Sequence, residues 1–132
     1  MLTIQIYNSF ATLNLLSGVS SFTNIKDLLD SFSAQKQTLD KYKMVQSIEC
    51  EKYAINEKVA CSHVETFKFD IPVISTKPIV NQLTVATISE KGIHYTIIYT
   101  APKKIFDDLL PVAEGMIKSF NITGTNLPWD DN

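Results

Sequence analysis

The stretch Gly92-Ile-His-Tyr-Thr-Ile-Ile-Tyr-Thr-Ala-Pro102 decides the fold. From Ile93 to Thr100, β-branched and aromatic residues alternate, and both faces carry apolar groups, a pattern typical of a central β-strand. Gly92 adopts a positive φ without steric cost, so it predicts a tight hairpin with a partner strand over residues 82–89. Pro102 has no N–H to donate to a ladder, and we expect the strand to end there.

The chain beyond this strand predicts a helix with one apolar face. Its large apolar residues recur three and four positions apart, at Phe106, Leu109, Leu110, Ala113, Met116, Ile117 and Phe120. Pro111 clashes with the preceding turn of a helix, so we expect a helical turn over residues 103–108 and a main helix from about Leu110. Packing on the strand would bury Phe106, Leu110, Ile117 and Phe120 against Tyr95, Ile97 or Tyr99.

The N-terminal third predicts one strand, one loop and one helix. Leu2, Ile4 and Ile6 alternate with other residues, as in a strand. Residues 8–22 are rich in Ser, Asn and Leu, and we expect a surface loop there. Asn24 is an N-cap residue with Asp27 three positions later, which predicts a helix over residues 25–39.

Residues 42–54 and 58–69 predict two strands joined by a turn at 55–57. The centre of this turn decides whether Cys61 faces Cys50 or Lys52. A disulfide can form only in the first arrangement, and only with the right Cβ geometry. A cytoplasmic location argues against one, so we expect both cysteines to be reduced. Pro72 and Pro78 make residues 70–81 extended or looped.

Composition and net charge limit the classes of protein to which the chain can belong. A chain of 132 residues with 45% hydrophobic and 20% charged residues forms one globular domain. The net charge of −2 argues against nucleic-acid binding, because phosphates need a basic face. The predicted fold class is α+β, an antiparallel sheet of about five strands packed with two helices. We expect one domain over residues 1–122 and a mobile tail over residues 123–132.

The C-terminal half resembles the signature of the PsbP-like family, which includes the extrinsic oxygen-evolving subunit of photosystem II and stand-alone prokaryotic homologues. The matching residues are Tyr95, Thr96, Tyr99, Thr100, Phe106, Leu110, Pro111, Ile117, Ser119 and Phe120. Upstream of this signature, the order of the predicted helices and strands extends the resemblance over roughly residues 2–122. It implies an antiparallel sheet between helices, and a non-enzymatic accessory or binding module that docks on a larger protein or membrane-associated complex.

The chain departs from the family at its beginning. Family members start with an aromatic-rich strand, whereas this chain opens directly on Leu2-Thr-Ile-Gln-Ile-Tyr7. We therefore expect an uncovered sheet edge and a homodimer through the N-terminal strand; the alternative is a monomer whose 8–22 loop covers that edge. No signal peptide or membrane-spanning run is visible. This pattern predicts a cytoplasmic protein if the start is as given, and an extracytoplasmic one if an upstream signal peptide is missing.

No nucleophile elbow, phosphate-binding loop or Cys-x-x-Cys motif occurs, so we predict no catalytic residue and no enzyme. Cys50 and Cys61 are interpreted as small strand residues, since no histidine is placed beside them. His63 and Glu65 share one strand face and His94 lies on another strand, which is a weak pattern for a metal. Partly exposed sheet histidines are the preferred interpretation.

Two acidic pairs are further metal candidates. Asp107-Asp108 and Asp130-Asp131 offer carboxylates to Ca²⁺, but adjacent carboxylates do not close a cage. Some PsbP relatives are linked to calcium and manganese retention, which keeps these pairs as candidates. The alternative function is therefore a small-ligand or metal (Ca/Mn) carrier that uses a cleft between a helix and the sheet. We predict no cofactor.

Overall fold

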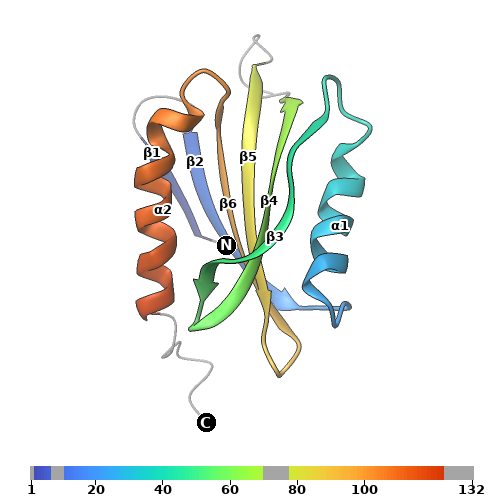
Figure 1. Cartoon of the computed structure of the whole chain (residues 1–132), viewed down its shortest axis with the longest axis vertical. Helices are drawn as coiled ribbons and strands as arrows, with labels where there is room; N and C mark the ends of the chain where they lie inside the picture. Colours follow the sequence, from blue (N-terminus) through green and yellow to red (C-terminus); the bar gives the residue numbers. More distant parts are fainter. Residues whose placement is uncertain (1, 7–10, 70–77, 124–132) are drawn as a thin grey trace.

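The computed structural model describes residues 2–6, 11–69 and 78–123. Six strands form one antiparallel sheet in the order β1-β2-β6-β5-β4-β3 (Figure 1). The α+β prediction is confirmed, with six strands in place of about five. The elements are β1 (Leu2–Ile6), β2 (Ala11–Val19), α1 (Ile25–Lys36), β3 (Lys43–Ile55), β4 (Lys58–Lys68), β5 (Ile79–Ile88), β6 (Ile93–Pro102) and α2 (Phe106–Thr123).

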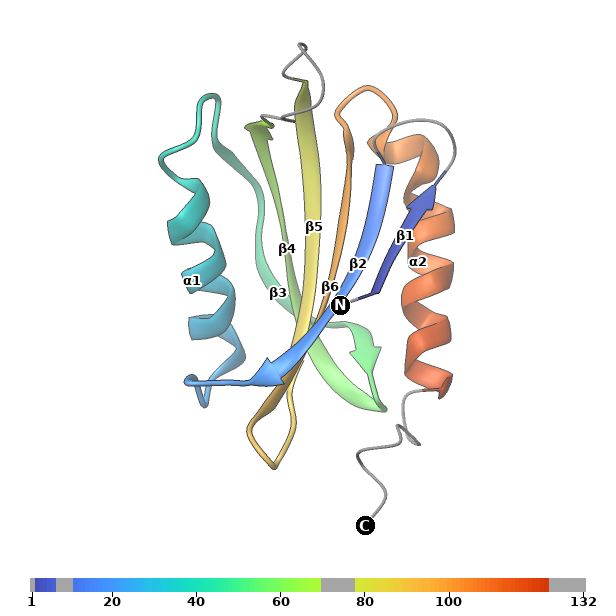
Figure 2. The same cartoon turned by 180° about the vertical axis from the view of Figure 1, so that it is seen from behind.

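The two helices lie on opposite faces of the sheet. Successive side chains of a strand point to opposite faces, so neighbours on β4 belong to different layers. Ala60 and Val64 pack with Phe106 of α2, whereas Cys61 packs with Leu29 of α1. The molecule therefore has three layers, with the twisted sheet between the two helices (Figures 1 and 2).

The additional strand is β2, and the expectation of a loop over residues 8–22 was wrong for its described part. Ala11 to Val19 pairs with β1 on one side and with β6 on the other. Asn14, Ser17 and Gly18 have low strand propensity, but pairing on both sides outweighs that preference. Ala11 and Leu13 alternate inward into the core, a short signal of the strand that the polar residues obscured.

The C-terminal helix is continuous, so the expected break before Leu110 was also wrong. It begins at Phe106 and contains Pro111. Proline has no N–H to donate to the carbonyl four residues earlier, so this helix loses one backbone hydrogen bond. Packing compensates, because Ala113 and Ile117 are buried against the sheet on the following turns. The other helix is capped by the Asn24 side chain as predicted, but it ends at Lys36.

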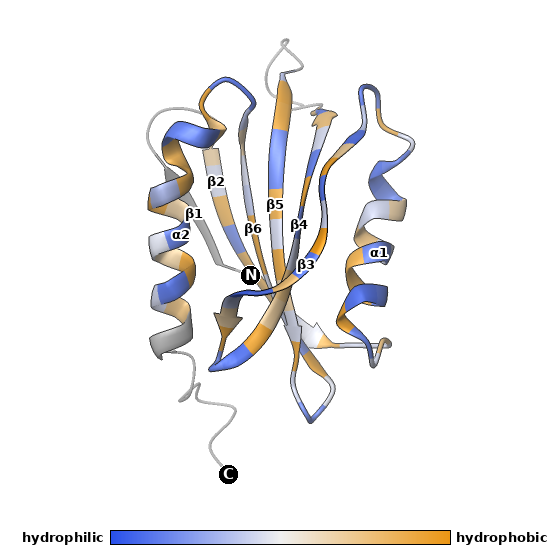
Figure 3. Ribbon diagram, viewed as in Figure 1, coloured by the Kyte–Doolittle hydropathy of each residue, from blue (hydrophilic) through white to orange (hydrophobic). Residues whose placement is uncertain are grey.

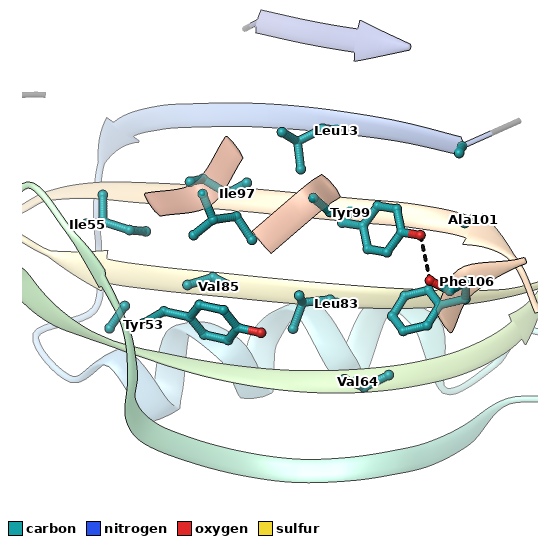
Figure 4. Close-up of a cluster of buried hydrophobic side chains, with 14 of the residues drawn as sticks. Leu13, Tyr53, Ile55, Val64, Leu83, Val85, Ile97, Tyr99, Ala101 and Phe106 are labelled. Carbon is teal, nitrogen blue, oxygen red and sulfur yellow. Dashed lines mark hydrogen bonds between the residues drawn. The ribbon is translucent and has the colours of Figure 1, made fainter. Parts of the chain in front are cut away.

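The core beneath α2 is built from aliphatic and aromatic side chains (Figure 4). The ring of Tyr99 stacks on Phe106 with centroids 4.8 Å apart, and its hydroxyl donates to the Phe106 carbonyl at 2.8 Å. Burial, with Asp107 and Asp108 nearby, raises the pKa of Tyr99. Phe106 and Ile117 are buried as expected, whereas Leu110 and Phe120 pack on the core while remaining partly exposed.

The turn between β3 and β4 is centred on Asn56 and Glu57. Both residues have positive φ, 54° and 65°, and Ile55 pairs with Lys58. Two central residues with positive φ are the hallmark of a turn whose twist matches that of a hairpin. Continued without interruption, this register would place Lys52 opposite Cys61.

A bulge in β3 changes that register and brings the cysteines together. Between Cys50 and Tyr53 the pairing shifts, and Glu51 has a φ of 79°. Cys50 then lies opposite Cys61, and the two sulfurs form a disulfide. The turn therefore lies where the arrangement with Lys52 opposite Cys61 requires it. The bulge nevertheless produces the other predicted pairing, Cys50 with Cys61.

Candidate functional site

One end of the sheet gathers exposed apolar residues beside lysines. We call it the lysine-rimmed end; it comprises the apolar residues Leu39, Met44, Val45, Phe69 and Ile79 and the lysines Lys41, Lys43, Lys68, Lys103 and Lys104. It is formed where α1 leads into β3, β4 ends, β5 begins and β6 leads into α2 (Figure 1). Hydrophobic and hydrophilic segments meet there (Figure 3).

Backbone hydrogen bonds hold these segments side by side. The Lys68 N–H donates to the Asp40 carbonyl at 2.8 Å, which joins the end of β4 to the connection after α1. The Phe69 N–H donates to the Pro78 carbonyl at 2.8 Å. The Lys103 N–H donates to the Ile79 carbonyl at 2.9 Å. Residues distant in sequence therefore meet at one end of the sheet, with Phe69 and Ile79 on opposite faces because Ile79 pairs with Lys68.

A pocket opens on this surface between the start of β5 and the connection from β6 to α2. It has a volume of about 740 Å³, and it is lined by Pro78, Ile79, Pro102, Lys103 and Lys104. Two prolines and an isoleucine supply apolar walls, and the lysines place ammonium groups within reach of the opening. The chemistry of this pocket suits an apolar group that carries a negative charge at one end.

A buried polar cluster lies beside the lysine-rimmed end, between α1 and the sheet. Glu65 of β4 is fully buried, and its Oε1 lies 2.9 Å from Nζ of Lys36 at the end of α1. The hydroxyl of Tyr42 donates to Oε2 of Glu65 at 2.7 Å. One carboxylate thus ties both ends of the 37–42 connection to the sheet and holds Leu39 and Lys41 in place.

The third neighbour of Glu65 is His63, two positions earlier on the same face of β4. Its Nε2 lies 3.1 Å from Oε1 of Glu65, but the contact is not directed well enough to be a hydrogen bond. The expectation of a partly exposed histidine was wrong for His63, whose side chain is fully buried. Among the described residues, neither of its ring nitrogens has a hydrogen-bond partner. Solvent does not reach His63 or Glu65, so they are not the open cleft that a carrier would use.

The environment of the cluster shifts two pKa values in opposite directions. Burial by itself raises the pKa of Glu65, but the contacts with His63, Lys36 and Tyr42 outweigh it and lower the pKa well below its usual range. Burial, followed by the hydrogen bond to the Glu65 carboxylate, raises the pKa of Tyr42 to about 12. The cluster therefore holds a carboxylate and a neutral phenol at neutral pH.

The opposite end of the sheet has a different character. A smaller pocket of about 260 Å³ lies between the two hairpin turns there, and its lining includes Asn56, Glu90 and Tyr95. Lys58 lies 3.6 Å from Glu90, and both side chains are exposed. Charges of both signs alternate at this end, so it offers neither a basic nor an apolar field.

The structure separates most residues that the sequence offered as metal ligands. His94 lies on the same sheet face as His63, but two strands away and four residues further along, roughly 15 Å apart. Burial lowers the pKa of His94, whose Nδ1 lies 3.2 Å from the Thr96 hydroxyl. Within residues 2–6, 11–69 and 78–123, no group of three His, Cys, Asp or Glu side chains is placed to hold a metal ion.

The acidic pairs do not join these residues. Asp107 and Asp108 occupy the first turn of α2, where negative charge interacts favourably with the helix dipole. Asp130 and Asp131 lie outside the described residues, as does the expected tail beyond Thr123, which is the last residue of α2. The expectation of two reduced strand cysteines was wrong, because Cys50 and Cys61 form a disulfide and the described part contains no free thiol.

Sequence reasoning missed the partners of Glu65 and the lysine-rimmed end. Lys36 and Tyr42 are 29 and 23 positions from Glu65, and no local pattern connects them. The available signal was the concentration of lysine at strand ends, at Lys41, Lys43 and Lys103-Lys104, which becomes a surface only when the strands are ordered.

No protein-family model matches the chain, and no curated protein shows significant similarity to it. Neither described helix combines the length and hydropathy needed to span a bilayer. The site itself therefore carries the functional argument.

Proposed function

We propose that this protein is a non-enzymatic, PsbP-like accessory module that docks on a larger protein or membrane-associated complex through the lysine-rimmed end. The observation that carries this proposal is the convergence of exposed apolar side chains from separate elements at one end of the sheet. Single exposed apolar residues are ordinary, whereas a gathered set rimmed by charge is typical of an interaction site.

The Glu65 cluster supports the same proposal by making the surface rigid. Binding costs less when the contacting segments are already held in their bound arrangement. Lys36 and Tyr42 hold the connection that presents Leu39 and Lys41, while the Lys68 N–H binds the Asp40 carbonyl. A buried carboxylate with two direct partners and no open path to solvent suits this positioning role better than acid–base chemistry.

The test compares the size of the native assembly in cells that make the protein. The double variant Val45→Asp with Ile79→Asp puts two negative charges into the lysine-rimmed end. The control Val19→Asp puts one negative charge on a residue that is 89% exposed and lies away from that end. We expect the wild type and Val19→Asp in a large assembly on native electrophoresis, and the double variant outside it, as the free 14.8 kDa chain or its dimer through β1. A wild-type protein that migrates alone and does not sediment with membranes, or a double variant that stays assembled, would contradict docking at this end.

A second candidate is a small-ligand carrier, which the pocket of about 740 Å³ favours because ligand sites are commonly of this size. A carrier of anionic amphiphiles would be stabilised by a medium-chain fatty acid in a thermal melt. Ile79→Asp should abolish that shift, since its carboxylate faces the same pocket as the ligand. An unchanged melting temperature of the wild type would remove this candidate.

Self-association through β1 is a further proposal on partners. β1 is an edge strand that pairs only with β2 among the described strands, whereas β3 at the other edge is interrupted by register shifts. Bulges discourage edge pairing, and β1 has none. We expect a dimer in sedimentation velocity that Ile4→Lys weakens; a monomer at all concentrations would remove the idea.

A further inference from the structure

The described part of the lysine-rimmed end carries an excess of positive side chains although the whole chain has a net charge of −2. Its five lysines face only three aspartates in the described part of this end, and these are Asp40, Asp107 and Asp108. Lys41, Lys43, Lys103 and Lys104 are exposed, and no ion pair among the described residues neutralises them. The positive field is therefore directed outward.

The composition of this surface fits lipid better than protein. All cations of the chain are lysines, because the sequence contains no arginine. Lysine is depleted at protein interfaces, where arginine and the large aromatic residues supply most of the binding energy. Basic residues interleaved with apolar ones are instead the pattern of surfaces that lie on anionic membranes.

We propose that the lysine-rimmed end docks directly on an anionic lipid bilayer, an inference that rests on the proposed docking function and names its partner. The ammonium groups of Lys103 and Lys104 bind headgroup phosphates. The side chains of Val45, Phe69 and Ile79 enter the boundary between headgroups and acyl chains. Long lysine stems lie along apolar surface while their charged ends stay in the headgroup layer, so both contacts form together.

The binding experiment uses the full chain and sedimented vesicles. One set contains phosphatidylcholine mixed with phosphatidylglycerol, and the other contains phosphatidylcholine alone. Each lysine near an anionic surface strengthens partitioning about fivefold, so Lys103→Gln with Lys104→Gln should weaken it about 25-fold. The matched control is Lys58→Gln with Lys91→Gln, which removes the same charge from the opposite end and should change partitioning less than about twofold.

A second pair of variants tests the apolar contact. Ile79→Asn should weaken vesicle binding about fivefold, because part of an isoleucine side chain leaves the bilayer. Val59→Asn is the control, since Val59 is 54% exposed on β4 beside the hairpin turn at the other end. It should bind as the wild type does.

Binding to anionic vesicles that falls with added salt and with both lysine-rimmed variants supports the proposal. Equal binding to both kinds of vesicle, or equal losses in the control variants, would overturn it. If no vesicle is bound while the cellular assembly still depends on Val45 and Ile79, the partner is a protein: the lipid proposal fails and the docking proposal stands. If the cellular assembly also ignores these residues, both proposals fail.

Discussion

The two faces of the sheet are stabilised by different chemistry. Beneath α2, a large cluster of aliphatic and aromatic side chains includes Leu13, Ile97 and Tyr99. Beneath α1, the apolar cluster is smaller, and the same face holds a disulfide and a buried carboxylate. The first face is stabilised by area removed from water, and the second by contacts between particular pairs of atoms.

The difference shows which face tolerates change. Hydrocarbon packing is non-directional, so similar side chains can replace one another with modest loss. The Glu65 carboxylate depends on Lys36 and Tyr42, and removal of one partner leaves a buried polar group unsatisfied. We therefore expect substitutions to act by lost volume beneath α2 and by lost partners beneath α1.

The largest effect is expected beneath α2. Phe106→Ala removes a buried ring that stacks on Tyr99, and it should lower the free energy of unfolding by about 3–5 kcal/mol. Val112→Ala on the exposed side of the same helix is the control and should cost less than about 0.5 kcal/mol. Urea denaturation measures both; similar losses would mean that this helix is not a core element.

The second largest effect is expected for Glu65→Gln, which should lower the free energy of unfolding by about 3 kcal/mol. Lys36 keeps its charge in this variant and loses its counterion. Its pH dependence is specific. The pKa of Glu65 is lower in the folded protein than the ordinary value of 4.5, so its stabilisation is complete above that value and is lost as the pH falls below it. Urea midpoints of the variant should therefore fall less steeply in acid than those of the wild type.

Reduction of the Cys50–Cys61 disulfide should cost about 2–3 kcal/mol, because the bond closes a short loop, with a sequence separation of 11, in the unfolded chain. Thermal melts with and without a reductant measure this loss. The double variant Cys50→Ala with Cys61→Ala should melt near the reduced protein and should not respond to reductant. A wild-type melt that reductant leaves unchanged would contradict the prediction.

The smallest effect is expected for Tyr42→Phe. It should lower the free energy of unfolding by less than about 1 kcal/mol at neutral pH, because Tyr42 is only partly buried. The pKa of Tyr42 is raised from 10.0 to about 12, so the unfolded chain loses the phenol proton first as the pH rises. Stability then falls between these values, and Tyr42→Phe should remove part of that fall. Equal slopes of the denaturation midpoints in alkaline buffers for wild type and variant would mean that folding does not raise the pKa of Tyr42, and would contradict the prediction.

Local patterns predicted the elements whose signal lies within a few residues. Alternation over residues 93–100 predicted β6, and the three-and-four spacing from Phe106 predicted the face of α2. Asn24 predicted the start of α1, because an N-cap acts on the N–H groups of the next turn. The strand β2 escaped prediction, since its polar residues are tolerated only between two neighbours that the sequence does not identify.

The sequence by itself therefore determined the fold class, most of the helix and strand positions, and the apolar face of α2, because periodicity reports burial directly. The tertiary structure alone decided the register that joins Cys50 to Cys61, which depends on a bulge at Glu51. It also decided that Lys36 and Tyr42 meet Glu65, and that lysines from separate strand ends form one surface. Such contacts join residues far apart in the chain, and their positions exist only once the strand order is set.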